Sequence, residues 1–357
     1  MSRASRGAAA LAALALSGSP PTRDLFGAPR QPVARTAARP SPRALAPRAS
    51  APEIVFEAPG AAGAAVQEIY VMNLDGSGRR QLTRDGKSKF LPHFSPDGRR
   101  ILYTKFLAGV YGDPNAQTDV AVFDLRTNAE SLLTHTTRGY QPAWSPDGSR
   151  IVFGSYLGDE LWTMGADGSD LRFVGGPGGA ADDQRWYDFA WSSDDWILFT
   201  VAQSVNGCFT ARLDKIRPDG SSRTKVTDGG PGCTAPGREA TGDADPGFSP
   251  DGRTIYSSRG IPRSAPGFPP TQTERKLFAF SSDAWAPGKS ERDLSLPSAP
   301  DCVEGVPKVS PDGARVLLFR ACGGEPFGVT LTDSDGTYRR WIVDGFGADW
   351  NPAAKRP

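Results

Sequence analysis

The stretch Pro-His-Phe-Ser-Pro-Asp-Gly at residues 92–98 sets the architecture of this chain, because variants of it recur along the sequence. Its last four residues occur four times, and a degenerate copy reads Ser-Ser-Asp-Asp. An apolar residue, usually aromatic, precedes every copy, and a truncated copy, Trp-Asn-Pro, stands at 350–352. Such register over so many copies indicates a repeat architecture. The tetrapeptides begin at Ser95, Ser145, Ser192, Ser249 and Ser310.

Each repeat is predicted to be four short antiparallel strands. Pro-Asp-Gly favours a tight turn, because Pro presets φ, Asp bonds nearby backbone and Gly accepts a positive φ. In one repeat this turn joins strands expected at 92–95 and 100–105, and a third strand is expected at 120–124. A second Gly turn and a fourth strand, such as 225–227, close a unit. Four antiparallel strands in about 40–60 residues are typical of a propeller blade.

The two ends of the chain are predicted to share one blade. The last repeat contains only its first strand, at 348–351, and the segment 53–57 matches the second strand of another repeat, 150–154. The sequence therefore predicts an all-β, six-bladed β-propeller with four antiparallel strands per blade. One C-terminal and three N-terminal strands would close the ring, which leaves no free sheet edge at the seam.

These motifs resemble the TolB-like family of six-bladed β-propellers, which are built of WD40-like repeats. Residues 69–83 followed by 92–98 carry the resemblance most fully, and it covers about residues 53–352. The resemblance implies a propeller that acts as a binding scaffold. It is specific for the fold and names no partner.

The N-terminal part has a different composition from the repeats. Residues 1–18 are predicted to be a signal peptide, since two Arg precede a short Ala/Leu run and then small residues. Residues 19–52 are predicted to be a Pro/Ala/Arg-rich disordered linker, and 53–357 the propeller. A periplasmic or extracellular location follows. An organelle transit peptide, or a tail without an address, remains an alternative.

Composition excludes several classes of protein. The 41 Gly and 32 Pro argue against a mostly helical chain, and 38% hydrophobic residues argue against a wholly disordered one. The net charge is +1, so nucleic acid is not an expected partner. That near-neutral total combines a basic stretch, eight Arg and one acid in residues 1–52, with a mildly acidic body. No apolar run is long enough to span a membrane.

The long connections are predicted to gather on one rim of the propeller. They fall at 106–118, 175–186, 202–208, 228–245, 259–274 and 298–305. Because rigid scaffolds often carry function on variable loops, this insertion-rich rim is the predicted binding face. Neutral drift at a permissive site would give the same lengths. The candidate binding residues lie in or beside these loops and off the repeat pattern: Tyr111, Trp186, Tyr187, Phe268, Asp243 and Asp245.

All four Cys are expected on this rim. Four Cys allow three pairings, and the blade arrangement favours Cys208 with Cys233 and Cys302 with Cys322. Two disulfides suit an oxidising compartment. Four buried thiols are an alternative, and a Cys₄ metal site is disfavoured because no Cys-x-x-Cys occurs.

No catalytic constellation is found in the sequence. It has two His, no Gly-x-Ser-x-Gly elbow and no phosphate-binding loop. The prediction is a non-enzymatic scaffold, without cofactor or metal, that binds an envelope protein, a peptide or a glycan. One alternative is a propeller enzyme, lactonase-like or sugar-dehydrogenase-like, with a metal in its channel. Another is a structural surface module whose linker does the tethering.

Overall fold

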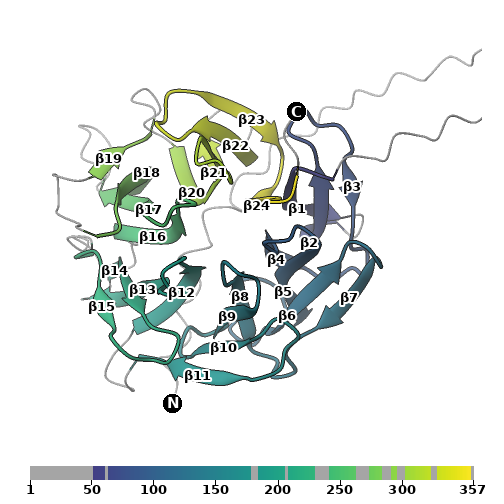
Figure 1. Ribbon diagram of the computed structural model, residues 1–357, viewed down its shortest axis with the longest axis horizontal. Helices are drawn as coiled ribbons and strands as arrows, with labels where there is room; N and C mark the ends of the chain where they lie inside the picture. Colours follow the sequence, from purple (N-terminus) through teal and green to yellow (C-terminus); the bar gives the residue numbers. More distant parts are fainter. Residues whose placement is uncertain are drawn as a thin grey trace, which may run out of the picture.

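The computed structural model describes residues 51–60, 63–177, 184–205, 208–229, 241–262, 273–283, 291–295, 302–322 and 328–354. Within these ranges the regular structure is entirely β, with 24 strands and no helix. No helix that could cross a membrane is found there. The strands form sheets that fan out around a central axis (Figure 1).

Three sheets have four antiparallel strands each. Their members, from the innermost strand outward, are β24 (Phe346–Trp350), β1 (Ile54–Gly60), β2 (Gly63–Met72) and β3 (Arg80–Gln81); β4 (Lys89–Phe94), β5 (Arg100–Ala108), β6 (Gln117–Asp124) and β7 (Ala129–Leu132); and β8 (Gly139–Trp144), β9 (Arg150–Ser155), β10 (Leu161–Gly165) and β11 (Arg172–Gly175).

The other twelve described strands are hydrogen-bonded into one sheet, because β14 pairs in parallel with β16, and β18 with β20. Antiparallel pairing divides them into three groups of four. These are β12 (Gln184–Trp191), β13 (Ile197–Val205), β14 (Cys208–Ile216) and β15 (Thr224–Lys225); β16 (Thr241–Phe248), β17 (Thr254–Pro262), β18 (Thr273–Ser281) and β19 (Glu291–Asp293); and β20 (Cys302–Val309), β21 (Arg315–Cys322), β22 (Gly328–Asp333) and β23 (Arg339–Val343).

The last strand of the chain pairs with the first. Ile54 of β1 lies opposite Trp350 of β24, and Val55 opposite Asp349. Asn351 continues the contact, since its N–H donates to the Glu53 carbonyl at 2.8 Å and its Nδ2 to the Pro52 carbonyl at 2.9 Å. The two ends of the described chain are therefore tied together in one sheet.

The Ser-Pro-Asp-Gly motif works as a hydrogen-bonded turn. In the first copy, Ser95 Oγ donates to Asp97 Oδ1 at 2.5 Å and accepts from the Arg100 N–H at 3.0 Å. Gly98 follows with φ 68°, a left-handed conformation that a side chain disfavours. The degenerate copy keeps the geometry with Asp195 at φ 66°, since Asp tolerates this region better than most residues. The motif therefore recurs because it closes the innermost hairpin of each group.

The residue before each turn belongs to the core between neighbouring sheets. Phe94, Trp144, Trp191 and Trp350 are 4–8% exposed. Trp144, for example, packs with Leu102 of the preceding sheet in one buried cluster. These aromatic residues fix how the innermost strands face the axis.

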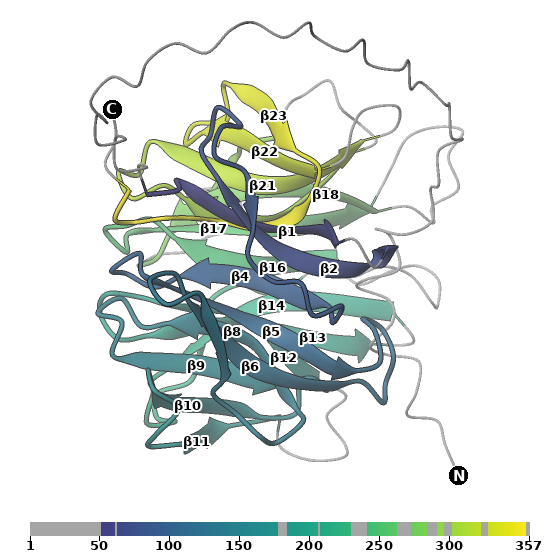
Figure 2. The ribbon, with the colours of Figure 1, turned by 90° about the vertical axis from the view of Figure 1, so that its right-hand side faces the viewer.

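The strands run across the thickness of the ring, so their connections gather on two opposite faces (Figure 2). We call the face that carries the Ser-Pro-Asp-Gly turns the turn face. The other, the loop face, carries the β5–β6 connection at 109–116 and the β9–β10 connection at 156–160.

Candidate functional site at the centre of the ring

Each innermost strand carries one residue in the left-handed region, four positions before the Ser of the turn or its equivalent. Five of the six have side chains, and their φ values lie between 48° and 57°. Positive φ is uncommon for residues other than Gly, so its recurrence at one register is a property of the fold. The residues are Leu91, Gln141, Asp188, Asp245, Val306 and Gly347.

A β-bulge accompanies each of the five innermost strands that end in a full or degenerate turn motif. The register of pairing shifts between Phe90 and His93 on β4, and in the same place on β8, β12, β16 and β20. Pro follows the left-handed residue in four strands, where a missing N–H costs no ladder bond. The bulge re-aims the left-handed residue, and five of the six such residues line a central cavity.

This cavity has a volume of about 20 Å³ open to water, enough for one water molecule. Its polar lining comes from five different innermost strands. The polar residues are His93, Gln141, Asp188, Asp245 and Lys308.

Two acids from adjacent strands form the negative side of the cavity. Burial, and next the charge of Asp245, raise the pKa of Asp188 to about 7. Gln141 holds Asp188 in place, since its Nε2 donates to Asp188 Oδ1 at 2.7 Å and its Oε1 accepts from the Asp188 N–H at 2.9 Å. Asp188 is therefore a carboxyl that exchanges a proton near neutral pH.

Lys308 and His93 form the other side. Burial lowers the pKa of Lys308, although Asp349, Asp245 and Asp188 oppose that shift. Burial and then the charge of Lys308 lower the pKa of His93, whose Nδ1 lies 3.6 Å from Asp349 Oδ2. The site thus presents acids and one amine to the same small space. Among the described residues, no group of three or more His, Cys, Asp or Glu is arranged to hold a metal ion.

Aromatic rings cover the loop-face side of half of the ring. Phe346, Phe90, Tyr140 and Tyr187 occupy one equivalent position on β24, β4, β8 and β12, where β16 and β20 have Ala244 and Gly305. The Phe90 ring centroid is 5.8 Å from that of Phe346 and 5.9 Å from that of Tyr140, both stacked. The centre of the ring is therefore asymmetric, with aromatic side chains on one half.

Comparison with known proteins shows which of them share this architecture. No protein-family profile matches the chain. The Tol-Pal system protein TolB of Anaeromyxobacter dehalogenans is 30% identical over 112 residues, 31% of this chain and 24% of that protein. The TolB structure from Acinetobacter baumannii superimposes with a TM-score of 0.59 at 16% identity, covering 85% of this chain and 68% of that one. A putative TolB from Agrobacterium tumefaciens gives 0.56 at 18% identity, covering 86% and 96%.

The fold is that of a TolB-like β-propeller. The resemblance inferred from the repeats is confirmed by these relatives. The chain spans about a quarter of the length of the curated relatives that it matches. One of these relatives is named as a Tol-Pal system protein, and another, from Chlorobaculum tepidum, as a TolB homolog.

The TolB-like propeller brings three of the predicted binding residues to its centre. Asp245 lines the cavity, and Tyr187 extends the aromatic half-ring, with its hydroxyl donating to the Leu157 carbonyl at 3.3 Å. Tyr111, in the β5–β6 connection, packs on Phe90 with ring centroids 5.0 Å apart. Burial and then the charge of Asp188 raise the pKa of Tyr111, so this phenol lies near the acids.

Two other predicted residues are not exposed. Trp186 is 2% exposed and packs on Phe199, with ring centroids 4.6 Å apart, so the expectation of a surface aromatic is wrong. The reason is that β12 begins at Gln184, which places Trp186 inside a strand. Asp243, also 2% exposed, pairs with Arg259 Nε at 2.9 Å and accepts from Ser257 Oγ at 2.8 Å. Its carboxylate is committed within the protein.

The cysteine prediction is confirmed for one pair. Cys302 and Cys322 form a disulfide across β20 and β21, with an S–S distance of 2.06 Å. Cys208 begins β14, but its side chain lies outside the described residues, as do Cys233 and Phe268. The Cys208–Cys233 pairing therefore stays a prediction.

Sequence reasoning missed three polar residues that line the cavity. Asp188, Gln141 and Lys308 lie on innermost strands, within the repeat pattern. The sequence does contain a pattern that indicates them. The repeat positions that face the axis differ between copies, while the positions next to them stay apolar. A search restricted to loops passes over them.

Proposed function

We propose that this chain is an exported TolB-like binding propeller. In this proposal the strands form six blades, and the pairing of β24 with β1 closes the ring. Residues 1–18 direct export, residues 19–52 form a linker that precedes the propeller, and the propeller works in the cell envelope. The likeness to Tol-Pal proteins supports the envelope setting.

The proposed binding site is the loop-face side of the centre. The observation that carries it is the convergence of Tyr111 and Tyr187 with Asp188 and Asp245, from three separate segments of the chain. Convergent polar groups within an apolar setting are the usual form of a binding site on a rigid scaffold.

Exposed apolar residues extend this site outward. Val110, beside Tyr111, is 53% exposed, and Leu157, whose carbonyl receives the Tyr187 hydroxyl, is 38% exposed. An extended segment of an envelope protein fits this surface best, because a peptide offers apolar side chains to Val110 and Leu157 and basic ones to the acids. A glycan would use the aromatic rings but not these apolar residues.

The test is capture from an envelope extract by the full chain, fixed to a support. We expect Tyr111→Ala and Asp245→Asn to lower the captured amount at least severalfold, because each removes one element of the proposed contact. Tyr338→Ala is the matched control, since Tyr338 is 47% exposed and follows a turn between β22 and β23 on the opposite face. Equal capture by all variants would overturn the proposed site, and capture abolished by glycosidase treatment alone would replace the peptide with a glycan.

A further inference from the structure

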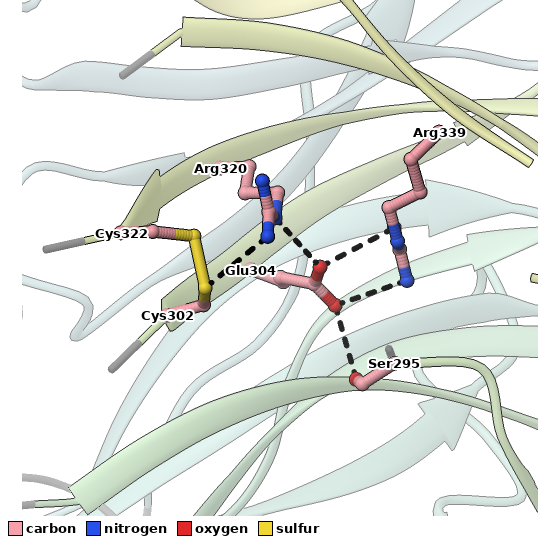
Figure 3. The surroundings of a disulfide bond; sticks show 6 residues. All are labelled: Ser295, Cys302, Glu304, Arg320, Cys322 and Arg339. Atoms are coloured by element: carbon pink, nitrogen blue, oxygen red, sulfur yellow. Dashed lines mark hydrogen bonds and ion pairs between the residues drawn. A yellow bond between two sulfur atoms is a disulfide. The ribbon is translucent and has the colours of Figure 1, made fainter. Parts of the chain in front are cut away.

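The disulfide lies beside a buried cluster of charged side chains (Figure 3). Cys302 and Cys322 face each other across β20 and β21. Arg320 stands two residues before Cys322 on β21, and its guanidinium reaches across to β20, where Nη2 donates to Cys302 Sγ at 3.4 Å. A permanent cation therefore contacts one of the two sulfurs directly.

Glu304 anchors this arginine from below. Its Oε1 lies 3.4 Å from Arg320 Nε and 3.3 Å from Arg339 Nη1, and its Oε2 accepts from Ser295 Oγ at 3.0 Å. Arg339 Nη2 reaches the same Oε2 at 3.4 Å, so Arg339 contacts both carboxylate oxygens. The Glu304 side chain is 3% exposed and that of Arg339 6%, which makes this a fixed, largely dry arrangement.

The two cysteines differ in exposure. Cys302 is 7% exposed, whereas Cys322 is half-buried. A thiol from solvent therefore reaches Cys322 more readily. The sulfur that it would release is the one in contact with Arg320.

We propose that Cys302–Cys322 is an exchangeable disulfide, in which an external thiolate attacks Cys322 Sγ and Cys302 leaves as a thiolate held by Arg320. The reductant is a dithiol. Its first thiolate forms an S–S bond to Cys322 while the Cys302–Cys322 bond breaks, and the bonding electron pair goes to Cys302 Sγ. Its second thiolate then forms the dithiol's own disulfide and releases Cys322 as a thiolate. The two cysteines are reduced, the dithiol is oxidised, and its two protons pass to the released thiolates or to solvent.

The chemical reason is leaving-group stability. Exchange is faster when the departing thiol is more acidic, and a neighbouring Arg favours the thiolate form. The charged groups around Cys302 in the described residues are Glu304 on its own strand, Arg320 on β21 and Arg339 on β23, with Arg275 of β18 opposite the adjacent Val303. Glu304 opposes the effect, but Arg339 offsets it by contacting both of its oxygens. This inference does not depend on the proposed binding function.

The test follows loss of this disulfide in the oxidised full chain under dithiothreitol, with alkylation and mass spectrometry of the peptides containing Cys302 and Cys322. We expect Arg320→Gln to slow the reduction by about three- to tenfold, as a leaving thiol one to two pK units less acidic would. Arg320→Lys keeps the charge and should restore part of the rate. Arg172→Gln is the control, because Arg172 is 64% exposed on the outer strand β11.

A second measurement needs no variant. Glutathione, a monothiol, should be trapped on Cys322 in preference to Cys302 in the wild-type chain. In the reduced chain, iodoacetamide should modify Cys302 with a pH midpoint below that of Cys322. Glutathione found mainly on Cys302, or a folded Arg320→Gln chain reduced at the wild-type rate, would overturn the proposal.

Discussion

Gln141 and Asp188 form two hydrogen bonds with each other between two neighbouring innermost strands, β8 and β12. The amide nitrogen donates to the carboxylate at 2.7 Å, and the Asp188 backbone donates to the amide oxygen at 2.9 Å. Both residues are in the left-handed region, with φ 48° and 57°. The side chain of the left-handed residue in one bulge therefore accepts a hydrogen bond from the backbone of the left-handed residue in the next. These bonds join neighbouring sheets at the cavity.

Gln141→Ala should lower the free energy of unfolding by about 1–3 kcal/mol, because it leaves a buried N–H and a carboxyl oxygen without their partner. Urea unfolding of the two proteins measures this. Gln117→Ala is the control, since Gln117 is exposed and should change stability by less than about 0.5 kcal/mol. Equal small effects for both variants would show that the pairing contributes nothing.

Asp245→Asn should lower the pKa of Asp188 from about 7, because the charge of Asp245 is the second cause of its upward shift after burial. Where a carboxyl has a raised pKa in the folded state, the free energy of unfolding of the protein falls as pH rises toward that pKa. The variant should therefore lose less stability than the wild type between pH 5 and pH 8. Carboxyl-carbon NMR of the Asp188 titration gives the direct reading, and an unchanged midpoint would contradict the coupling.

Glu57 supplies a second pH test. Its carboxyl accepts from the Leu91 N–H at 2.6 Å, and burial raises its pKa to about 8. The folded protein therefore holds a proton on Glu57 that the unfolded chain releases above about pH 4.5. Stability should fall as pH rises from about 4.5 to 8, by at most about 1.4 kcal/mol per pH unit from this group.

Glu57→Gln keeps the oxygen that Leu91 uses and cannot ionise. The variant should match the wild type at pH 5 and exceed it in stability at pH 8.5. Denaturant unfolding at both pH values checks this. A variant that loses stability equally at both values would mean that the amide does not fit and that ionisation of Glu57 has no part.

The repeat made much of the fold predictable. Ser95, Asp97 and Gly98 form a turn whose bonds are local, so their types alone indicate its geometry. The strand expected at 100–105 and the pairing of the chain ends follow from the same register. The disulfide between Cys302 and Cys322 was predicted from placing both on the rim of one blade, and the structure places them opposite each other on β20 and β21.

The site was less predictable, because its backbone is decided by tertiary context. Leu91 and Val306 take a positive φ that their own types disfavour, and only the shared bulge explains it. The pKa of Asp188 depends on Asp245, which is far away in the sequence but adjacent in the ring. Trp186 was misplaced because β12 extends further toward the loop face than the repeat spacing indicated.

Trp186 and Tyr187 are neighbours in sequence with opposite expected roles. Trp186 packs on Phe199 and under the Arg223 guanidinium, 4.5 Å from its ring, so Trp186→Ala should lower the free energy of unfolding by about 3–5 kcal/mol. Trp186→Phe should cost far less, since the indole N–H has no hydrogen-bond partner in the described structure.

Tyr187→Ala should instead reduce partner capture per folded molecule, with a smaller change in stability. Thermal unfolding and capture, measured on the same preparations, separate the two roles. If Trp186→Phe lost capture while remaining folded, Trp186 would be a contact residue after all.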